Sequence, residues 1–181
     1  MLEGVKNLMA SVKNLMPGRK AEAGDEPVRQ FTEQELARAN KVIPIMSKVN
    51  ATIFRVTNGR LGSTFIGGAP VGVLHHTGAK SGAAYETPLI VLEDDPNVVV
   101  VASKAGMPEH PAWYFNLKAN PDCRMHLKGR PVRDVRARTA TEAEREVLWP
   151  KLDAIYGDFA EYRQRADLVD RRIELFVLEP R

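Results

Sequence analysis

A glycine-bracketed loop brings hydroxyl, amide and ammonium groups together. The run Thr77-Gly78-Ala79-Lys80-Ser81-Gly82 lies between two apolar segments that are typical of strands. Successive backbone amides at such a turn form a concave nest for an anion, and a lysine adds a charge-assisted hydrogen bond to phosphate or carboxylate. Taken alone, the run fits an ordinary solvated hairpin loop better, so an anion site needs support from a second motif.

A second serine-lysine pair follows the apolar segment 98–102. The residues Ser103-Lys104-Ala105-Gly106 lead to Pro111, which is expected to open a helix through about residue 118. The N-terminus of a helix favours anions because its free amides and its dipole point toward them. With the aromatic run Trp113-Tyr114-Phe115, the two loops are consistent with a site for a phosphorylated, planar ligand. The aromatic side chains also fit a core, where helical aromatics usually lie.

The cysteine and histidine patterns argue against other kinds of site. Cys123 is the only cysteine, which excludes an intrachain disulfide and a CxxC metal site and fits a cytoplasmic location. His75 and His76 are neighbours on a predicted strand, so they point to opposite faces. No HExxH-like spacing supplies the three ligands of a catalytic zinc. We predict no metal site, and we place Cys123 in the core or at its rim.

The net charge of +3 is concentrated at the N-terminus. Residues 1–20 carry four basic residues and one acidic residue, whereas the other 161 residues carry 22 of each. The pI of about 9.1 therefore does not indicate a body that binds nucleic acid. Lys6 and Lys13 lie opposite a leucine, valine and methionine stripe that Pro17-Gly18 ends. We predict a short basic amphipathic helix, either docked on the body or a partner, or bound peripherally to an anionic membrane.

The rest of the chain predicts short strands joined mainly by hairpins. Residues 17–30 are polar and contain glycine and proline, so they are typical of a linker. A helix is expected over 32–54, kinked or split at Pro44, and a helical region over 141–168 is expected to break at Pro150. The strand candidates are 63–66, 70–76, 86–92, 97–103, 122–128, 131–139 and 172–178.

This pattern indicates an α+β protein with an antiparallel sheet. Several short strands in a chain of this length suggest a closed or partly closed barrel, with helices over its ends and mouth. No GxGxxG follows a strand, so a Rossmann dinucleotide site is not supported. No apolar run reaches the roughly 18 residues of a membrane span, and no signal peptide is visible.

Three longer segments carry a resemblance to a known family. They read GAKSGAAYETPLIVLED, then VVVASKAGMPEHPAWYFNLKANP, and finally YGDFAEY followed by VDRRIELFVLEP. In order and spacing they resemble the deazaflavin-dependent nitroreductases, and the upstream run MSKVNATIFRVTNGRLGSTFIGG extends the resemblance over residues 46–180. Members of this family use coenzyme F-420 (F420), an 8-hydroxy-5-deazaflavin with a phosphate-linked oligoglutamate tail. The resemblance implies an α+β fold, namely an antiparallel split β-barrel (an FMN-binding-like roll) with flanking helices.

The resemblance also implies a division of the chain and a set of cofactor contacts. Residues 1–30 would be the basic helix with its linker, and residues 31–181 the split β-barrel that binds the deazaflavin. The implied cofactor contacts come from the two serine-lysine loops, one strand and the helix start: Lys80, Ser81, Gly82, Pro88, Leu89, Ala102, Ser103, Lys104, Ala112, Trp113 and Asn116.

The implied reaction delivers a hydride from reduced F420 to a lipophilic acceptor, such as a quinone, a nitroaromatic or an activated enone. We expect Ser103 to donate a hydrogen bond to the accepting oxygen or nitro group. Tyr156 and Tyr162 are expected to orient the acceptor or help to deliver the proton. The residues expected on the substrate side are Ile90, Tyr156, Phe159 and Tyr162.

Two departures from the family pattern affect the cofactor tail. Ala79 stands where the family usually has an arginine, and Ala83-Ala84-Tyr85 replaces a stretch that usually ends in arginine. Each exposed ion pair contributes about 0.2–1 kcal/mol, so tail affinity is expected to fall several-fold without being lost.

Two alternative functions stay open from the sequence. The same barrel could hold a fatty acid or another lipid without catalysis, or it could be a flavin reductase that binds FMN. The expected state is a monomer or a homodimer. The expected location is the cytoplasm, and the helix in residues 1–20 would allow contact with the cytoplasmic face of the cell membrane.

Overall fold

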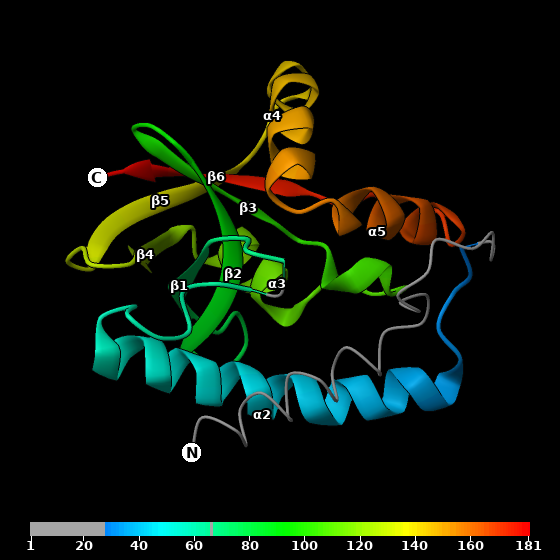
Figure 1. Cartoon of the computed structure of the whole chain (residues 1–181), viewed down its shortest axis with the longest axis horizontal. Coiled ribbons are helices and arrows are strands. Elements are labelled where there is room, and N and C mark those ends of the chain that lie inside the picture. The colour runs from blue at the N-terminus through cyan, green and yellow to red at the C-terminus, as the bar shows by residue number, and fades with distance from the viewer. Residues whose placement is uncertain (1–27, 66) are drawn as a thin grey trace.

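Six antiparallel strands close into a barrel in this computed structural model, which describes residues 28–65 and 67–181. The order around the barrel is β1-β2-β3-β6-β5-β4, and β4 pairs with β1 to close it (Figure 1). The predicted α+β antiparallel barrel with flanking helices is confirmed. The strands are β1 (Val71–Thr77), β2 (Ala84–Asp94), β3 (Asn97–Val101), β4 (Asp122–His126), β5 (Arg133–Thr139) and β6 (Leu175–Pro180).

Helices cover the barrel on several sides. The long α2 runs along one side of the molecule, and α4 and α5 lie at the opposite side (Figure 1). The predicted amphipathic helix within residues 1–20 lies outside the described residues. The described helical elements are α2 (Glu33–Thr57), the short 3-10 turn η1 (Lys104–Gly106), α3 (Ala112–Ala119), α4 (Glu142–Ile155) and α5 (Asp158–Asp167).

Two apolar clusters explain why these strands and helices pack as they do. One fills the barrel interior, where Leu74, Met125 and Phe176 meet Trp113 and Leu117 from α3. The other lies between the barrel wall and the helices α4 and α5. Strand β3 is apolar over 98–101 because its alternate residues belong to the two different clusters. Continuous apolar strands are expected where both faces of a strand are covered.

A bidentate ion pair joins α4 to the barrel. Thr141 and Glu144 form a capping box at the start of α4, as the local sequence favours. Arg138 on β5 also donates to both carboxylate oxygens of Glu144, at 2.7 and 2.6 Å, and to Glu179 on β6 at 2.8 Å. Glu144 is therefore bonded to β5 through Arg138, and Arg138 in turn joins it to Glu179 on β6.

Two local predictions, the strand at 63–66 and the break at Pro150, were wrong, and the helix expected over 32–54 is not split at Pro44. The strand expected at 63–66 is a single bridge between Thr64 and Pro70, because the surrounding glycines turn the chain before a ladder can form. Helices α2 and α4 continue through Pro44 and Pro150. A proline removes only one hydrogen bond from a helix that packing holds along its length. The break after α4 instead comes at Tyr156, whose backbone is extended.

The loop after β3 adopts a strained backbone that other elements hold in place. Lys104, Ala105 and Gly106 have φ angles of 43°, 53° and 76°. Arg165 on α5 donates to the Ala105 carbonyl at 2.8 Å, and Arg171 donates to the carbonyls of Ser103 and Glu109. Both arginine side chains are buried. These contacts offset the cost of the left-handed conformation, which is about 1–2 kcal/mol for each residue with a side chain.

We expect Gly106→Ala to destabilise the protein more than Gly129→Ala. Both glycines have positive φ, at 76° and 68°, so both substitutions introduce backbone strain. A Cβ at Gly106 would also lie 2.6 Å from the Tyr162 carbonyl oxygen and 2.8 Å from Arg165 Cβ, whereas nothing lies within 4 Å at Gly129. Urea unfolding should show an additional loss of about 1 kcal/mol or more for Gly106→Ala. Equal losses of unfolding free energy in the two variants would show that the close contacts at Gly106 add nothing to the cost of the substitution.

Candidate active site

A single large cavity collects most of the residues that the sequence singles out. It has a volume of about 2260 Å³ and lies between α2, the strands β1 and β2, the start of α3 and the aromatic side chains that follow α4. All the predicted site residues except Gly82 and Ala102 line it. Ala102 is fully buried in the barrel interior, and Gly82 lies at an exposed turn with φ of 65°. These two predicted cofactor contacts therefore lie outside the lining of the cavity.

The glycine-bracketed loop forms a turn whose amides are mostly occupied. The amides of Gly78 and Gly82 donate to carbonyls of the same loop, and the amide of Ala83 donates to Ser81 Oγ. The amide of Ala79 donates to Asn116 Oδ1 at 2.9 Å. Within the described residues, the amides left without a protein partner are those of Lys80 and Ser81. The expected anion nest thus consists of two adjacent amides and the exposed Lys80 side chain.

The second serine-lysine loop faces the same cavity. Ser103 precedes η1, and its hydroxyl makes no hydrogen bond with any described residue. The Lys104 ammonium lies 3.5 Å from Glu109, and its side chain is only 19% exposed. Both residues of this serine-lysine pair therefore line the cavity that Lys80 and Ser81 also line.

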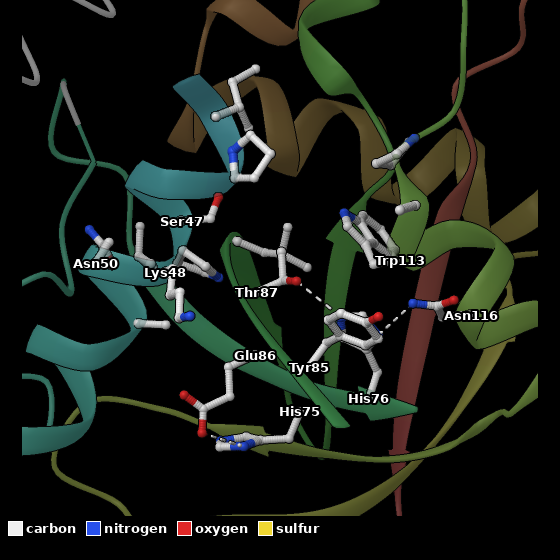
Figure 2. Close-up of a pocket in the computed structure, with 18 of the residues that line it drawn as sticks. Ser47, Lys48, Asn50, His75, His76, Tyr85, Glu86, Thr87, Trp113 and Asn116 are labelled. Atoms are coloured by element: carbon white, nitrogen blue, oxygen red, sulfur yellow. Dashed lines mark hydrogen bonds and ion pairs between the residues drawn. The ribbon is translucent and has the colours of Figure 1, made fainter. Parts of the chain in front are cut away.

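A polar network links α3 to the two strands beside the anion loop. Asn116 Nδ2 lies 3.0 Å from His76 Nδ1, and His76 Nε2 lies 2.9 Å from Thr87 Oγ1 (Figure 2). Burial, together with the neighbouring His75, lowers the pKa of His76 to about 4, so its imidazole is neutral at pH 7. Sequence reasoning missed His76 and Thr87, because only the register of β1 on β2 brings them together.

The aromatic trio forms another wall of the cavity. Tyr156 follows α4, while Phe159 and Tyr162 lie on α5, and the ring centroids are 5.1 to 6.2 Å apart. The Tyr156 hydroxyl donates to Asp158 at 2.9 Å, so the 2.9 Å contact between the two tyrosines uses the proton of Tyr162. Burial raises the pKa of Tyr162 to about 12 and that of Tyr156 further. Both remain neutral phenols at any working pH.

Helix α2 supplies a wall that the sequence motifs did not indicate. Ser47, Lys48 and Asn50 of this helix belong to the cavity lining (Figure 2). Below them, Glu86 on β2 lies 3.5 Å from His75 and 3.7 Å from Arg55 of α2. A single sequence gives no signal for this wall, because α2 meets the barrel only in the tertiary fold.

Two other kinds of function find no support in the described residues. Residues 28–65 and 67–181 contain no group of three or more histidine, cysteine or acidic side chains that could hold a metal ion. The same part of the chain contains no helix that is long and apolar enough to cross a membrane.

Comparisons with known proteins agree with the family that the motifs suggest. The family model for F420H(2)-dependent quinone reductases matches residues 46–180. The Mycobacterium tuberculosis protein Rv3178, which carries the name of an F420H(2)-dependent quinone reductase, is 39% identical over 122 residues. That match covers 67% of this chain and 99% of the relative. Rv1261c of the same organism, also named an F420H(2)-dependent quinone reductase, is 42% identical over 80 residues, or 44% of this chain and 54% of that protein.

Solved structures give the same result. An F420-H2 dependent reductase (FDR-A) is 39% identical and aligns with a TM-score of 0.55 over 61% of this chain and 94% of that chain. A structure described as a domain-swapped dimer is 32% identical and aligns with a TM-score of 0.58 over 82% of this chain and 100% of that chain. The predicted split β-barrel and the predicted dependence on F420 are confirmed by these matches. The chain belongs to the F420H(2)-dependent quinone reductases.

Proposed function

We propose that the cavity binds F420 between the two serine-lysine loops and holds a lipophilic acceptor against the aromatic trio. The observation that carries this proposal is the convergence of both loops and all three aromatic residues on one cavity. The two loops are separated by strands β2 and β3 in the sequence, so their convergence reflects the barrel topology. Quinones are the acceptors that fit best, because a mostly aromatic wall favours a flat, apolar ring.

The residues present suit a phosphorylated cofactor. The two unpartnered amides of Lys80 and Ser81 and the cations of Lys80 and Lys104 form a donor set for phosphate oxygens. The cavity volume of about 2260 Å³ is larger than the roughly 300–1,000 Å³ of ordinary ligand pockets. It therefore offers room for both a tailed cofactor and an acceptor. Pro88, Leu89, Ala112, Trp113 and Asn116 also line the cavity and complete the proposed cofactor contacts.

The bound deazaflavin would supply the hydride, and the protein would supply orientation and polarity. Ser103 has a free hydroxyl and is the proposed donor to the accepting oxygen, where negative charge develops. Tyr162 donates to Tyr156, and Tyr156 donates to Asp158. These two phenols are thereby held at fixed positions, and their raised pKa values favour hydrogen bonding over ionisation. Ile90 and Phe159 would pack against the acceptor.

Binding and turnover with F420 test this proposal directly. Reduced F420 added to the purified protein should quench tryptophan fluorescence, because Trp113 lines the cavity. Menadione added afterwards should oxidise the cofactor, which is followed by its absorbance. No quenching at micromolar cofactor would contradict the proposal. Binding of a fatty acid or of FMN under the same conditions would then favour the alternative functions.

Single substitutions should separate cofactor binding from catalysis. We expect Lys104→Ala and Lys80→Ala to raise the Kd for F420 several-fold, because each removes a cation from the phosphate site. Ser103→Ala should leave the Kd within about two-fold and lower kcat about ten-fold or more, since it removes a donor used during hydride transfer. Lys151→Ala is a matched control, because Lys151 pairs with Asp94 away from the cavity. An unchanged kcat in Ser103→Ala would contradict the role of Ser103.

We further propose that residues 1–20 hold the enzyme at a membrane that contains its acceptor. These residues lie outside the described part of the chain, and the proposal rests on Lys6 and Lys13 opposite a stripe of leucine, valine and methionine. A lipophilic quinone is concentrated in the membrane, so contact would shorten its path to the cavity.

Deletion of residues 1–20 should abolish sedimentation with vesicles that contain anionic lipid and spare turnover of soluble menadione. The reason is that the segment carries the whole net charge of +3, whereas the rest of the chain is neutral. Vesicles of neutral lipid serve as the control for the electrostatic contribution to vesicle binding. Sedimentation of the truncated protein with anionic vesicles would show that another surface binds them.

A further inference from the structure

The hydrogen bonds beside the anion loop fix the orientation of Asn116. The backbone amide of Ala79 lies 2.9 Å from Asn116 Oδ1 and can only donate. The oxygen of the Asn116 side chain must therefore point to the loop, and its NH₂ group must point the other way. That NH₂ group lies 3.0 Å from His76 Nδ1.

The orientation of Asn116 in turn selects one tautomer of His76. The amide nitrogen has no lone pair to offer, so His76 Nδ1 must accept the hydrogen bond and carries no proton. The single proton of the neutral ring is then on Nε2. The ring is 6% exposed, and Tyr85 stacks on it at a centroid distance of 5.8 Å. Asn116 therefore selects the tautomer with Nε2–H, and burial favours the neutral ring.

This tautomer makes Thr87 an acceptor toward His76. The Nε2–H group lies 2.9 Å from Thr87 Oγ1 and donates to it (Figure 2). A threonine hydroxyl has one proton and two lone pairs, so its own proton remains unused by this contact. No other described group bonds the Thr87 hydroxyl, and Thr87 lines the cavity. The hydroxyl therefore has a proton available for a bound molecule.

We propose that Thr87 is a further cofactor-binding residue, whose hydroxyl donates a hydrogen bond to an acceptor oxygen of F420. His76 is the positioning residue, because its Nε2–H group binds one lone pair of that hydroxyl and cannot take the hydroxyl proton, which stays available to the ligand. The opposite tautomer of His76 would take the Thr87 proton and remove the donor. This inference rests on the proposed binding of F420 in the cavity, and it adds a neutral donor to the cations of the two loops.

The network also connects this donor to the anion loop. Ala79, Asn116, His76 and Thr87 belong to the loop, α3, β1 and β2 in turn, and each link has a single allowed direction. The loop conformation that leaves the Lys80 and Ser81 amides free also places the Ala79 amide on Asn116. Through Asn116 and His76, the same conformation keeps the Thr87 hydroxyl proton available to a ligand. A ligand that contacts both would meet a site organised before it binds.

The first test compares Thr87→Val with Thr87→Ser. Valine keeps the shape and removes the hydroxyl, so we expect the Kd for F420, measured by tryptophan quenching, to rise about 3- to 10-fold. Serine keeps the hydroxyl, so its Kd should stay within about two-fold of that of the wild type. A valine variant that binds as tightly as the wild type would overturn the role of Thr87. Failure of the wild type itself to bind F420 would instead overturn the proposed function.

The second test reads the tautomer of His76 in the protein without cofactor. Long-range ¹H–¹⁵N NMR correlations distinguish a ring protonated at Nε2 from one protonated at Nδ1. We expect the Nε2–H form of His76 at pH 7, and a predominant Nδ1–H form would overturn the inference. This measurement does not depend on activity or on the folding of any variant.

A double-mutant cycle then tests the positioning role. His76→Leu removes the group that orients the Thr87 hydroxyl, so adding Thr87→Val to it should change the Kd by less than about two-fold. A full 3- to 10-fold effect of Thr87→Val in that background would show that Thr87 acts without His76. Loss of F420 binding in His76→Leu together with an intact fold by circular dichroism would support the coupling between the network and the site.

Discussion

Two buried arginines hold the loop that carries Ser103 in a conformation that its own sequence does not favour. Three consecutive residues, Lys104 to Gly106, have positive φ, and only the last is a glycine. Arg165 and Arg171 donate to the carbonyls that this backbone turns outward. Because the serine hydroxyl and the lysine ammonium leave the same loop, their direction into the cavity depends on these hydrogen bonds.

The same arginines join parts of the chain that are far apart. Arg165 also donates to the carbonyl of Arg29, and its guanidinium lies 4.8 Å from the ring of Phe31. The segment before α2, the loop after β3 and helix α5 therefore meet at one buried charged group. Burial of a charge is tolerated only when hydrogen bonds replace its water. The Ala105 and Arg29 carbonyls and the Glu161 carboxylate provide that replacement for Arg165. The hydrogen bonds to the loop carbonyls in turn offset part of the cost of the strained backbone.

The cavity combines cations with neutral hydrogen-bond donors. The described cations that line it include Lys48, Arg55, Lys80 and Lys104. The neutral His76 network and the Ser103 hydroxyl add donors without adding charge. Neutral donors give direction rather than long-range attraction, so such a site would select a ligand by the positions of its oxygens.

The sequence by itself determined the strand pattern, the antiparallel barrel, the two serine-lysine loops and the aromatic trio, because alternation, turn residues and motif spacing are local properties. It also determined the family, since three motifs occur in one order. Only the tertiary structure decided that α2 forms a wall of the cavity and that Pro44 and Pro150 leave their helices continuous. It alone placed Ala102 inside the barrel and paired His76 with Thr87. These features depend on register and on packing between distant segments, and neither leaves a periodic signal along the chain.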